Sequence, residues 1–166
     1  MKIYQHVAEQ VVPTTLNRAW AFFSDARNLK NITPEEMNFV ILSDLGDGKV
    51  YPGMLIHYKV SPLLNIPLRW TTEITNVKEG EYFIDEQRFG PFAMWHHEHY
   101  FKEVEGGVYM RDQVDYAIPF GPLGRLAHAI TVKNRVKEIF EYRNKKLQTL
   151  FPARQPQMGN NVMVSV

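Results

Sequence analysis

The chain has 166 residues, enough for one domain with a sizeable core, and its 19 Lys and Arg nearly balance 18 Asp and Glu. That balance argues against nucleic acid as a partner, because phosphate binding needs a basic surplus or patch. The absence of Cys excludes disulfides, cysteine metal ligands and thiol nucleophiles. No apolar run approaches the roughly 20 residues that span a bilayer, and the first ten residues lack the apolar core of a secretory signal. We therefore expect a cytoplasmic protein.

The predicted elements begin with a strand and two short helices. Alternating apolar residues predict a strand over Lys2–Val12, which Pro13 ends. Helical spacing predicts a helix over Leu16–Ser24 and a second helical piece over Ala26–Asn31. Six further strands then follow one another, separated by short Gly, Pro and Asp turns that favour antiparallel neighbours. Their predicted ranges are Asn38–Leu45, Met54–Val60, Leu68–Val77, Tyr82–Phe89, Ala93–Glu105 and Val108–Ile118.

One long helix closes the predicted domain. It is expected over Leu123–Leu150, and the stripe expected to be buried comprises Leu126, Ile130, Val136, Ile139, Phe140, Arg143 and Leu147. Residues 1–151 are expected to form the domain, and 152–166 a flexible tail. The order predicts an α+β protein with a curved seven-stranded antiparallel sheet around this helix, because the sheet's apolar face needs a cover.

The stretch Tyr82–Phe101 carries the most specific pattern. Strand alternation puts Trp95, His97, His99 and Phe101 on one face, with two imidazoles between aromatic rings. Neither a core strand nor a solvent face usually has this composition, so the pattern indicates the wall of an internal cavity. The full set of residues expected to bind a ligand is Trp70, Asp85, Gln87, Trp95, His97, His99, Phe101, Asp112, Tyr116 and Phe140.

Turn chemistry predicts which of these residues pair across strands. A two-residue turn at Gly106-Gly107 sets His97 across from Tyr116 and His99 across from Val114, with Asp112 diagonal to His99. A three-residue turn at Gly90–Phe92 sets Asp85 across from His97 and Gln87 across from Trp95. A turn of another length breaks the second alignment.

The His–Asp cluster admits several interpretations. A carboxylate beside an imidazole raises its basicity, as general acid–base catalysis requires; equally, such groups satisfy one another in a polar layer of a core. His-x-His with a carboxylate is also a conceivable metal set. Because no recognised spacing such as His-Glu-x-x-His is present, the sequence predicts no metal and no cofactor.

The loops at one end of the predicted sheet are unusually apolar. Antiparallel connections bring the loops at 61–67, 90–92 and 119–123 to the same end, and loops are usually polar. The residues expected to form a cavity mouth there are Leu63, Leu64, Ile66, Phe92, Phe120 and Leu123. A mouth that touches a membrane transiently, a loop closure and a dimer contact are the alternatives for this end.

The chain resembles the START/SRPBCC superfamily, and within it the bacterial ligand-binding SRPBCC domain proteins. The residues that carry the resemblance are Pro67 and Trp70 with Thr72 and Ile74; Phe83, Asp85, Gln87 and Gly90-Pro91-Phe92; Trp95, His97, His99 and Phe101; Asp112, Val114 and Tyr116 with Pro119-Phe120-Gly121; and Ile139-Phe140 with Arg143. The resemblance implies a helix-grip fold. It also implies a small hydrophobic molecule or lipid as partner, or else a cyclase/dehydratase activity of the His–Asp cluster; a third possibility is a protein-interaction module with a vestigial cavity.

Overall fold

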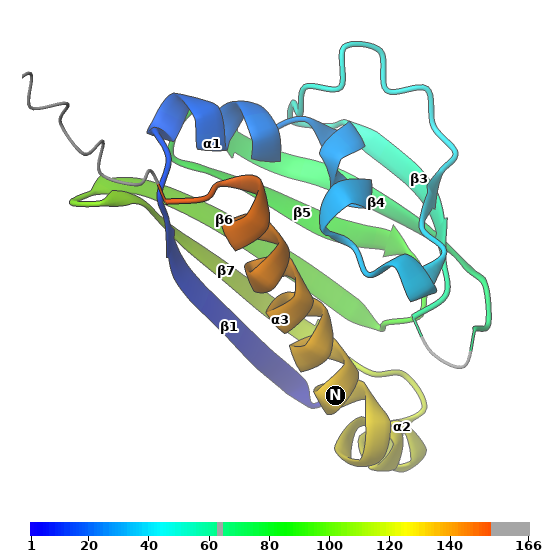
Figure 1. The fold of residues 1–166 in the computed structure, drawn as a ribbon. Helices are drawn as coiled ribbons and strands as arrows, with labels where there is room; N and C mark the ends of the chain where they lie inside the picture. The colour runs from blue at the N-terminus through cyan, green and yellow to red at the C-terminus, as the bar shows by residue number, and fades with distance from the viewer. Residues whose placement is uncertain (63–64, 154–166) are drawn as a thin grey trace, which may run out of the picture.

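A computed structural model describes residues 1–62 and 65–153, which form an antiparallel sheet and a set of helices on one of its faces (Figure 1). The sheet has seven strands in the order β1-β7-β6-β5-β4-β3-β2. The strands are β1 Ile3–Val12, β2 Val40–Ile41, β3 Leu55–Val60, β4 Leu68–Lys78, β5 Tyr82–Phe89, β6 Met94–Val104 and β7 Gly107–Ala117. The helical segments are α1 Leu16–Phe23, the 3-10 turns η1 Ala26–Ile32 and η2 Glu35–Met37, α2 Gly121–Ala127, the π turn η3 His128–Val132 and α3 Lys133–Leu150. The predicted helix-grip architecture is confirmed.

Two helical layers cover different parts of the inner face of the sheet. In Figure 1, α3 lies over the β1 and β7 side, and α1 with the 3-10 turns lies over the β3 to β6 side. Val136, Phe140, Arg143 and Leu147 are the buried residues of α3. At the far end of α3 the ring of Phe151 is buried and packs edge-on to Phe22. The helices therefore close the sheet at this end and leave space nearer the start of α2.

The C-terminal helix differs from its prediction at its start. It begins at Gly121, after Phe120, which takes a left-handed conformation (φ 69°), and a π turn interrupts it. A π turn shifts the phase of the helical faces, and the predicted buried positions Leu126 and Ile130 are in fact 56% and 66% exposed. The predicted stripe is correct only from Val136 onward.

The second predicted strand is much shorter than expected. Instead of Asn38–Leu45, only Val40–Ile41 pairs with β3. Asn38 adopts a left-handed conformation (φ 49°) at the end of η2, and the backbone N–H groups of Leu42 and Ser43 both donate to the carbonyl of His57. Both features interrupt the regular hydrogen-bond ladder, so β2 begins later and ends earlier in the sequence than predicted.

The register of β6 and β7 corrects the predicted pairings. Val104 pairs with Gly107, so the turn is Glu105-Gly106, one residue earlier than predicted. His97 therefore lies across from Val114, and His99 lies across from Asp112. Because each partner changes by two positions, every side chain stays on its predicted face. His97, His99 and Asp112 are all buried, which confirms that they face the interior.

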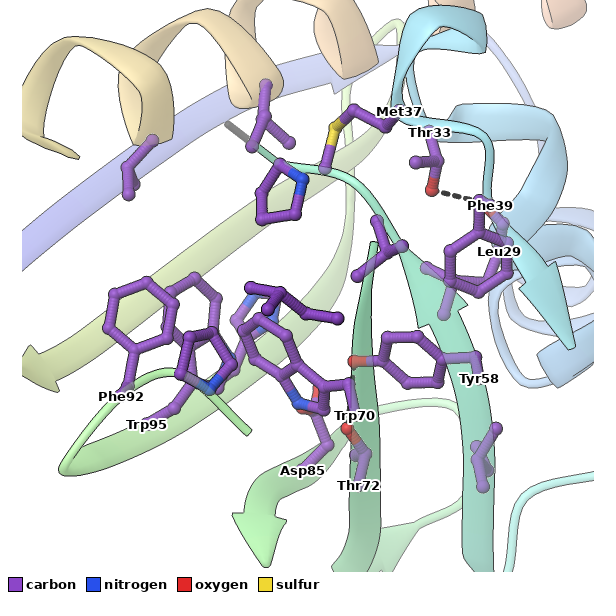
Figure 2. A pocket seen from close by; sticks show the side chains of 18 of the residues that line it. Leu29, Thr33, Met37, Phe39, Tyr58, Trp70, Thr72, Asp85, Phe92 and Trp95 are labelled. Carbon is purple, nitrogen blue, oxygen red and sulfur yellow. Dashed lines mark hydrogen bonds and ion pairs between the residues drawn. The ribbon is translucent and has the colours of Figure 1, made fainter. Parts of the chain in front are cut away.

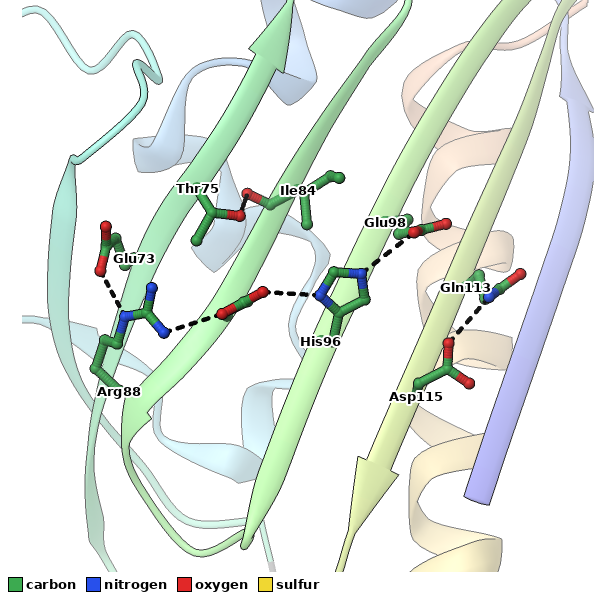
Figure 3. A network of polar contacts seen from close by, with 9 residues as sticks. Glu73, Thr75, Ile84, Arg88, His96, Glu98, Gln113 and Asp115 are labelled. Carbon is green, nitrogen blue, oxygen red and sulfur yellow. Dashed lines mark hydrogen bonds and ion pairs between the residues drawn. The ribbon is translucent and has the colours of Figure 1, made fainter. Parts of the chain in front are cut away.

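The outer face of the sheet is polar, and a row of side chains crosses its strands (Figure 3). Arg88 bridges Glu73 and Glu86, and His96 joins Glu86 to Glu98 at 3.0 and 3.2 Å. The side chain of His96 is 27% exposed within this row. Opposite charges on neighbouring strands suit a solvated sheet surface.

Candidate functional site

A cavity of about 640 Å³ lies between the inner face of the sheet and the helices. Its size is in the range of pockets that hold small organic molecules, roughly 300–1,000 Å³. Figure 2 shows its wall, to which β3 and β4 contribute Tyr58, Trp70 and Thr72 and the segment before β2 contributes Leu29 and Met37. Most lining side chains are apolar, so a ligand in this cavity is surrounded mainly by carbon.

Aromatic rings form one corner of this wall. The rings of Trp70 and Trp95 meet edge-to-face at 5.4 Å, and the ring of Phe92 lies 4.8 Å from that of Trp95. Phe140 reaches the wall from α3, with its ring 5.6 Å from that of His97. Among the described residues, the indole nitrogen of Trp70 is buried without a hydrogen-bond partner. An unpaired buried donor costs about 1–3 kcal/mol, which favours an acceptor atom beside it.

The structure brings six of the ten predicted binding residues to the cavity wall. These are Trp70, Asp85, Trp95, His97, His99 and Phe140. The other four are not among its lining residues. Asp112 and Tyr116 are buried beneath it, and Phe101 packs in the core against Trp20 and Phe23 of α1, with ring separations of 5.6 and 5.4 Å.

Gln87 closes a turn instead of facing the cavity. Its side-chain amide donates to the carbonyl of Phe92 at 2.7 Å and accepts from the Phe92 N–H at 3.2 Å. The β5–β6 ladder ends at Glu86 and His96, so Gln87 and Trp95 do not pair as predicted, whereas the predicted pairing of Asp85 with His97 is confirmed. Gln87 therefore holds the loop that presents Phe92.

Four ionisable side chains meet at the floor of the cavity. His99 Nε2 lies 2.9 Å and His97 Nδ1 3.4 Å from Asp85 Oδ2. On the far side, His97 Nε2 lies 3.1 Å and His99 Nδ1 2.7 Å from Asp112 Oδ1. The two imidazoles thus stand between two carboxylates. Register explains this arrangement, since Asp85 lies directly across from His97, and Asp112 directly across from His99.

Arg143 completes this cluster from α3. Its guanidinium lies 3.5 Å from Asp112 Oδ1 and over the ring of Phe140, and its side chain is 9% exposed. Of the two possibilities open to a cation on the apolar stripe, snorkelling to solvent or pairing with an acid of the sheet, the structure shows the second. Arg143 also borders the cavity, so a positive charge stands in its wall.

The pKa values of the cluster follow from the balance between burial and these contacts. Burial by itself raises the pKa of Asp112, but His97, His99 and Arg143 outweigh it and hold that pKa well below its usual value. The same competition between burial and the two imidazoles lowers the pKa of Asp85. Burial by itself lowers the pKa of His99, but Asp112 and Asp85 outweigh it and raise that pKa. The folded cluster therefore favours carboxylates with an imidazolium.

These shifts give the cluster a definite pH window. The depressed pKa of Asp112 stabilises the folded state at pH values above 3.8, the ordinary pKa of this group. This stabilisation is lost as the pH falls below that value. The raised pKa of His99 stabilises the folded state fully at pH values below 6.5, the ordinary pKa of histidine. This stabilisation is lost as the pH rises. We expect the difference in unfolding free energy between wild type and Asp112→Asn to be largest between these two values. Urea denaturation across the pH range checks this, and a pH-independent difference contradicts it.

The predicted mouth residues that the structure describes all border the cavity: Ile66, Phe92, Phe120 and Leu123. Phe120 and Leu123 are 79% and 70% exposed. Phe92 differs, since it is half-buried against the aromatic corner and is part of the wall. Leu63 and Leu64 lie outside the described residues, as do residues 154–166 of the predicted tail.

Several wall residues were absent from the sequence prediction. Leu29 and Met37 come from the 3-10 segments, and Thr33 lies between these segments. Tyr58 comes from β3, where its hydroxyl lies 3.1 Å from that of Thr72. The alternation of β3 places Tyr58 on the same face as Ile56 and Val60. This alternation is visible in the sequence, so Tyr58 could have been predicted. The 3-10 turns have no comparable periodicity, so nothing local identified their inner side.

No model of a protein family matches the sequence, and no curated protein matches it either. Solved structures do match. The protein CV1439 from Chromobacterium violaceum is 14% identical, with a TM-score of 0.69, and the match covers 91% of this chain and 99% of that one. A START superfamily protein from Mycobacterium smegmatis is also 14% identical, with a TM-score of 0.62 and coverage of 90% and 96%.

A plant protein has the same architecture. The major latex-like protein 151 from Panax ginseng is 9% identical, with a TM-score of 0.62 and coverage of 90% of this chain and 98% of that one. Among the described residues, no helix is both long and apolar enough to cross a membrane. The resemblance to the START/SRPBCC superfamily is thus confirmed at the level of the fold: this chain is a helix-grip protein.

Proposed function

We propose that this protein binds a small hydrophobic or aromatic molecule in the cavity between the sheet and the C-terminal helix. The observation that carries the proposal is the cavity of about 640 Å³, with apolar and aromatic walls and a cluster of polar groups at one place on its floor. Pockets for small molecules combine these two features, because carbon surface supplies affinity and a few polar groups set orientation.

The polar groups define which end of the ligand lies on the floor. The Asp85, His97 and His99 side chains border the cavity together with Arg143, and the Trp70 indole N–H is unpaired among the described residues. Hydrogen-bond donors outnumber free acceptors on the cavity floor, because the carboxylate of Asp85 already interacts with the two imidazoles. The ligand that fits best is an apolar or aromatic body with one hydroxyl, carbonyl or carboxylate group.

The ligand enters, in this proposal, between the start of α2 and the loops that precede β4 and β6. Phe120 and Leu123 are exposed there although they are large and apolar, and both border the cavity. Apolar side chains at an entrance lower the cost of transferring a greasy molecule from a membrane or another carrier.

Substitution at this entrance provides the test. We expect Phe120→Asp with Leu123→Asp to weaken uptake of the dye 1-anilinonaphthalene-8-sulfonate by about tenfold or more, which corresponds to roughly 1.4 kcal/mol. The unfolding free energy is expected to change by about 0.5 kcal/mol or less, as at other exposed positions. Fluorescence titration and urea denaturation measure the two quantities.

A matched control uses two exposed apolar residues that do not border the cavity, Phe89 and Leu42, at 74% and 54% exposure. Phe89→Asp with Leu42→Asp is expected to leave dye uptake unchanged. An equal loss of dye uptake in both double variants would show that the dye binds on the surface and not in the cavity. Native mass spectrometry of protein purified from its own host then identifies the bound molecule.

The alternative is an enzyme of the cyclase or dehydratase type. The observation that favours it is the imidazole pair between two carboxylates on the cavity floor, at 2.7 to 3.4 Å, since a carboxylate-bound imidazole is a good general base. An enzyme converts its ligand and loses rate in His97→Ala, whereas a carrier returns the ligand unchanged.

A further inference from the structure

Three donor atoms on the cavity floor lie close enough together to share one ion. Asp85, His97 and His99 each offer one oxygen or nitrogen, and these atoms all lie within 4.8 Å of one another. All three side chains border the cavity. The binding of an apolar body does not require two imidazoles and a carboxylate to converge on one point, so the cluster needs its own explanation.

The two separations from Asp85 Oδ2 to the imidazole nitrogens fit a coordination sphere. Two ligand atoms that each lie about 2.1 Å from a metal are about 3.0 Å apart at a right angle and about 3.4 Å apart at the tetrahedral angle. Asp85 Oδ2 lies 2.9 Å from His99 Nε2 and 3.4 Å from His97 Nδ1. An ion can therefore enter between these atoms with small side-chain movements.

The opposite nitrogens of both rings face a second carboxylate. His97 Nε2 hydrogen-bonds to Asp112 Oδ1 at 3.1 Å, and His99 Nδ1 lies 2.7 Å from the same oxygen without the angle of a hydrogen bond. Asp112 is 4% exposed. Metal-binding histidines usually donate their remaining N–H to a carboxylate, which sets the tautomer and orients the ring. Asp112 stands where such a supporting carboxylate is needed, and it does not border the cavity.

Charge also favours a cation at this place. Two buried carboxylates, Asp85 and Asp112, face one guanidinium, that of Arg143, which lies beside Asp112 at 3.5 Å. A cation bound on the cavity side adds positive charge beside Asp85, where burial makes an unpaired charge costly. Among the described residues no ion pair joins Asp85 to an arginine, and Asp85 is the carboxylate on the cavity side.

We propose that Asp85 Oδ2, His97 Nδ1 and His99 Nε2 bind a divalent first-row transition-metal ion such as Zn²⁺ or Fe²⁺. Two imidazoles and one carboxylate are a donor set that these ions accept, and three protein ligands leave positions open. All three residues border the cavity, so an oxygen of a bound molecule has access to an ion held there. This proposal does not depend on which apolar molecule the cavity holds.

The sequence made His-x-His with a carboxylate a conceivable metal set, but it predicted no metal because these residues do not have a recognised ligand spacing. Asp85 belongs to β5 and the histidines to β6, and only the pairing of Asp85 with His97 brings them together. Metal sites that sequence spacing reveals usually have their ligands on one helix or one short loop.

The test uses protein without an affinity tag, stripped of metal by dialysis against a chelator. Isothermal titration with Zn²⁺ is expected to show one saturable site per chain, and Co²⁺ is expected to give visible absorption bands and to quench the fluorescence of Trp95, whose ring is 6.3 Å from that of His97. His97→Gln and His99→Gln are expected to abolish this binding. Asp112→Asn keeps all three ligands and is expected to weaken binding by about 10- to 100-fold.

Controls come from two histidines outside the cluster, His57 and His96, which hydrogen-bond to Thr71 and to Glu86. His57→Gln and His96→Gln are expected to bind Zn²⁺ as the wild type does. If the cluster variants fail to fold, imidazole ¹⁵N spectra of the wild type with Zn²⁺ decide, with His97 Nδ1 and His99 Nε2 expected to shift. The absence of a saturable site in folded wild type overturns the proposal, as do shifts confined to His57 or His96.

Discussion

Replacing Asp112 by Ala is expected to lower the free energy of unfolding by about 3–5 kcal/mol, the cost of leaving a buried charge without its partner. Arg143 then keeps a buried guanidinium without its carboxylate, His97 Nε2 loses its hydrogen-bond partner, and the carboxylate 2.7 Å from His99 Nδ1 is removed. Urea denaturation near pH 7 measures the loss. Among the described residues, Arg143 forms an ion pair with one carboxylate only, that of Asp112.

A control for this expectation lies on the same strand. Asp115 is on the outer face of β7, where it hydrogen-bonds to Gln5 and Gln113. Asp115→Ala is expected to cost about 1 kcal/mol or less. Arg143→Met is expected to cost less in the Asp112→Ala background than in the wild type, because the two side chains share one interaction. Equal losses from Asp112→Ala and Asp115→Ala contradict the charged cluster as a stabilising element.

Filling the cavity is expected to abolish ligand-induced stabilisation. A ligand present at 100 times its dissociation constant stabilises a protein by about 2.7 kcal/mol. Ile139 on α3 borders the cavity and packs against the core around Trp70. In Ile139→Trp the larger ring occupies space that the ligand needs, so the dye is expected to add almost no stability. Urea denaturation with and without the dye measures this difference.

The same substitution at Ile130 provides the matched comparison. Ile130 lies in η3, which runs directly into α3, is 66% exposed and is not among the residues that line the cavity. Ile130→Trp is expected to retain the full stabilisation by the dye. A folded Ile139→Trp protein that responds to the dye as the wild type does shows that the cavity between sheet and helix is not where the dye binds.

Local sequence patterns determined which side of each strand faces inward. The alternation from Trp95 to Phe101 requires that His97 and His99 share a face, whatever the neighbouring strands do. Turn residues then predicted antiparallel neighbours, and the terminal helix was the element long enough to cover the sheet. For this reason the helix-grip architecture and the buried cluster were both predictable, although the turn between β6 and β7 lies one residue earlier than predicted.

Only the tertiary structure decided which inward residues face the cavity. Phe101 and His99 lie on the same face of β6, but α1 covers Phe101, whereas His99 stays at the cavity. Gln87 is the next residue after Asp85 on the same face of β5, but its side chain hydrogen-bonds to the backbone of Phe92 instead of facing the cavity. The wall also includes Leu29 and Met37, whose inner position depends on irregular turns. Periodicity is a property of neighbouring residues, whereas a cavity is the space that remains after distant segments have packed, and that space depends on all of them together.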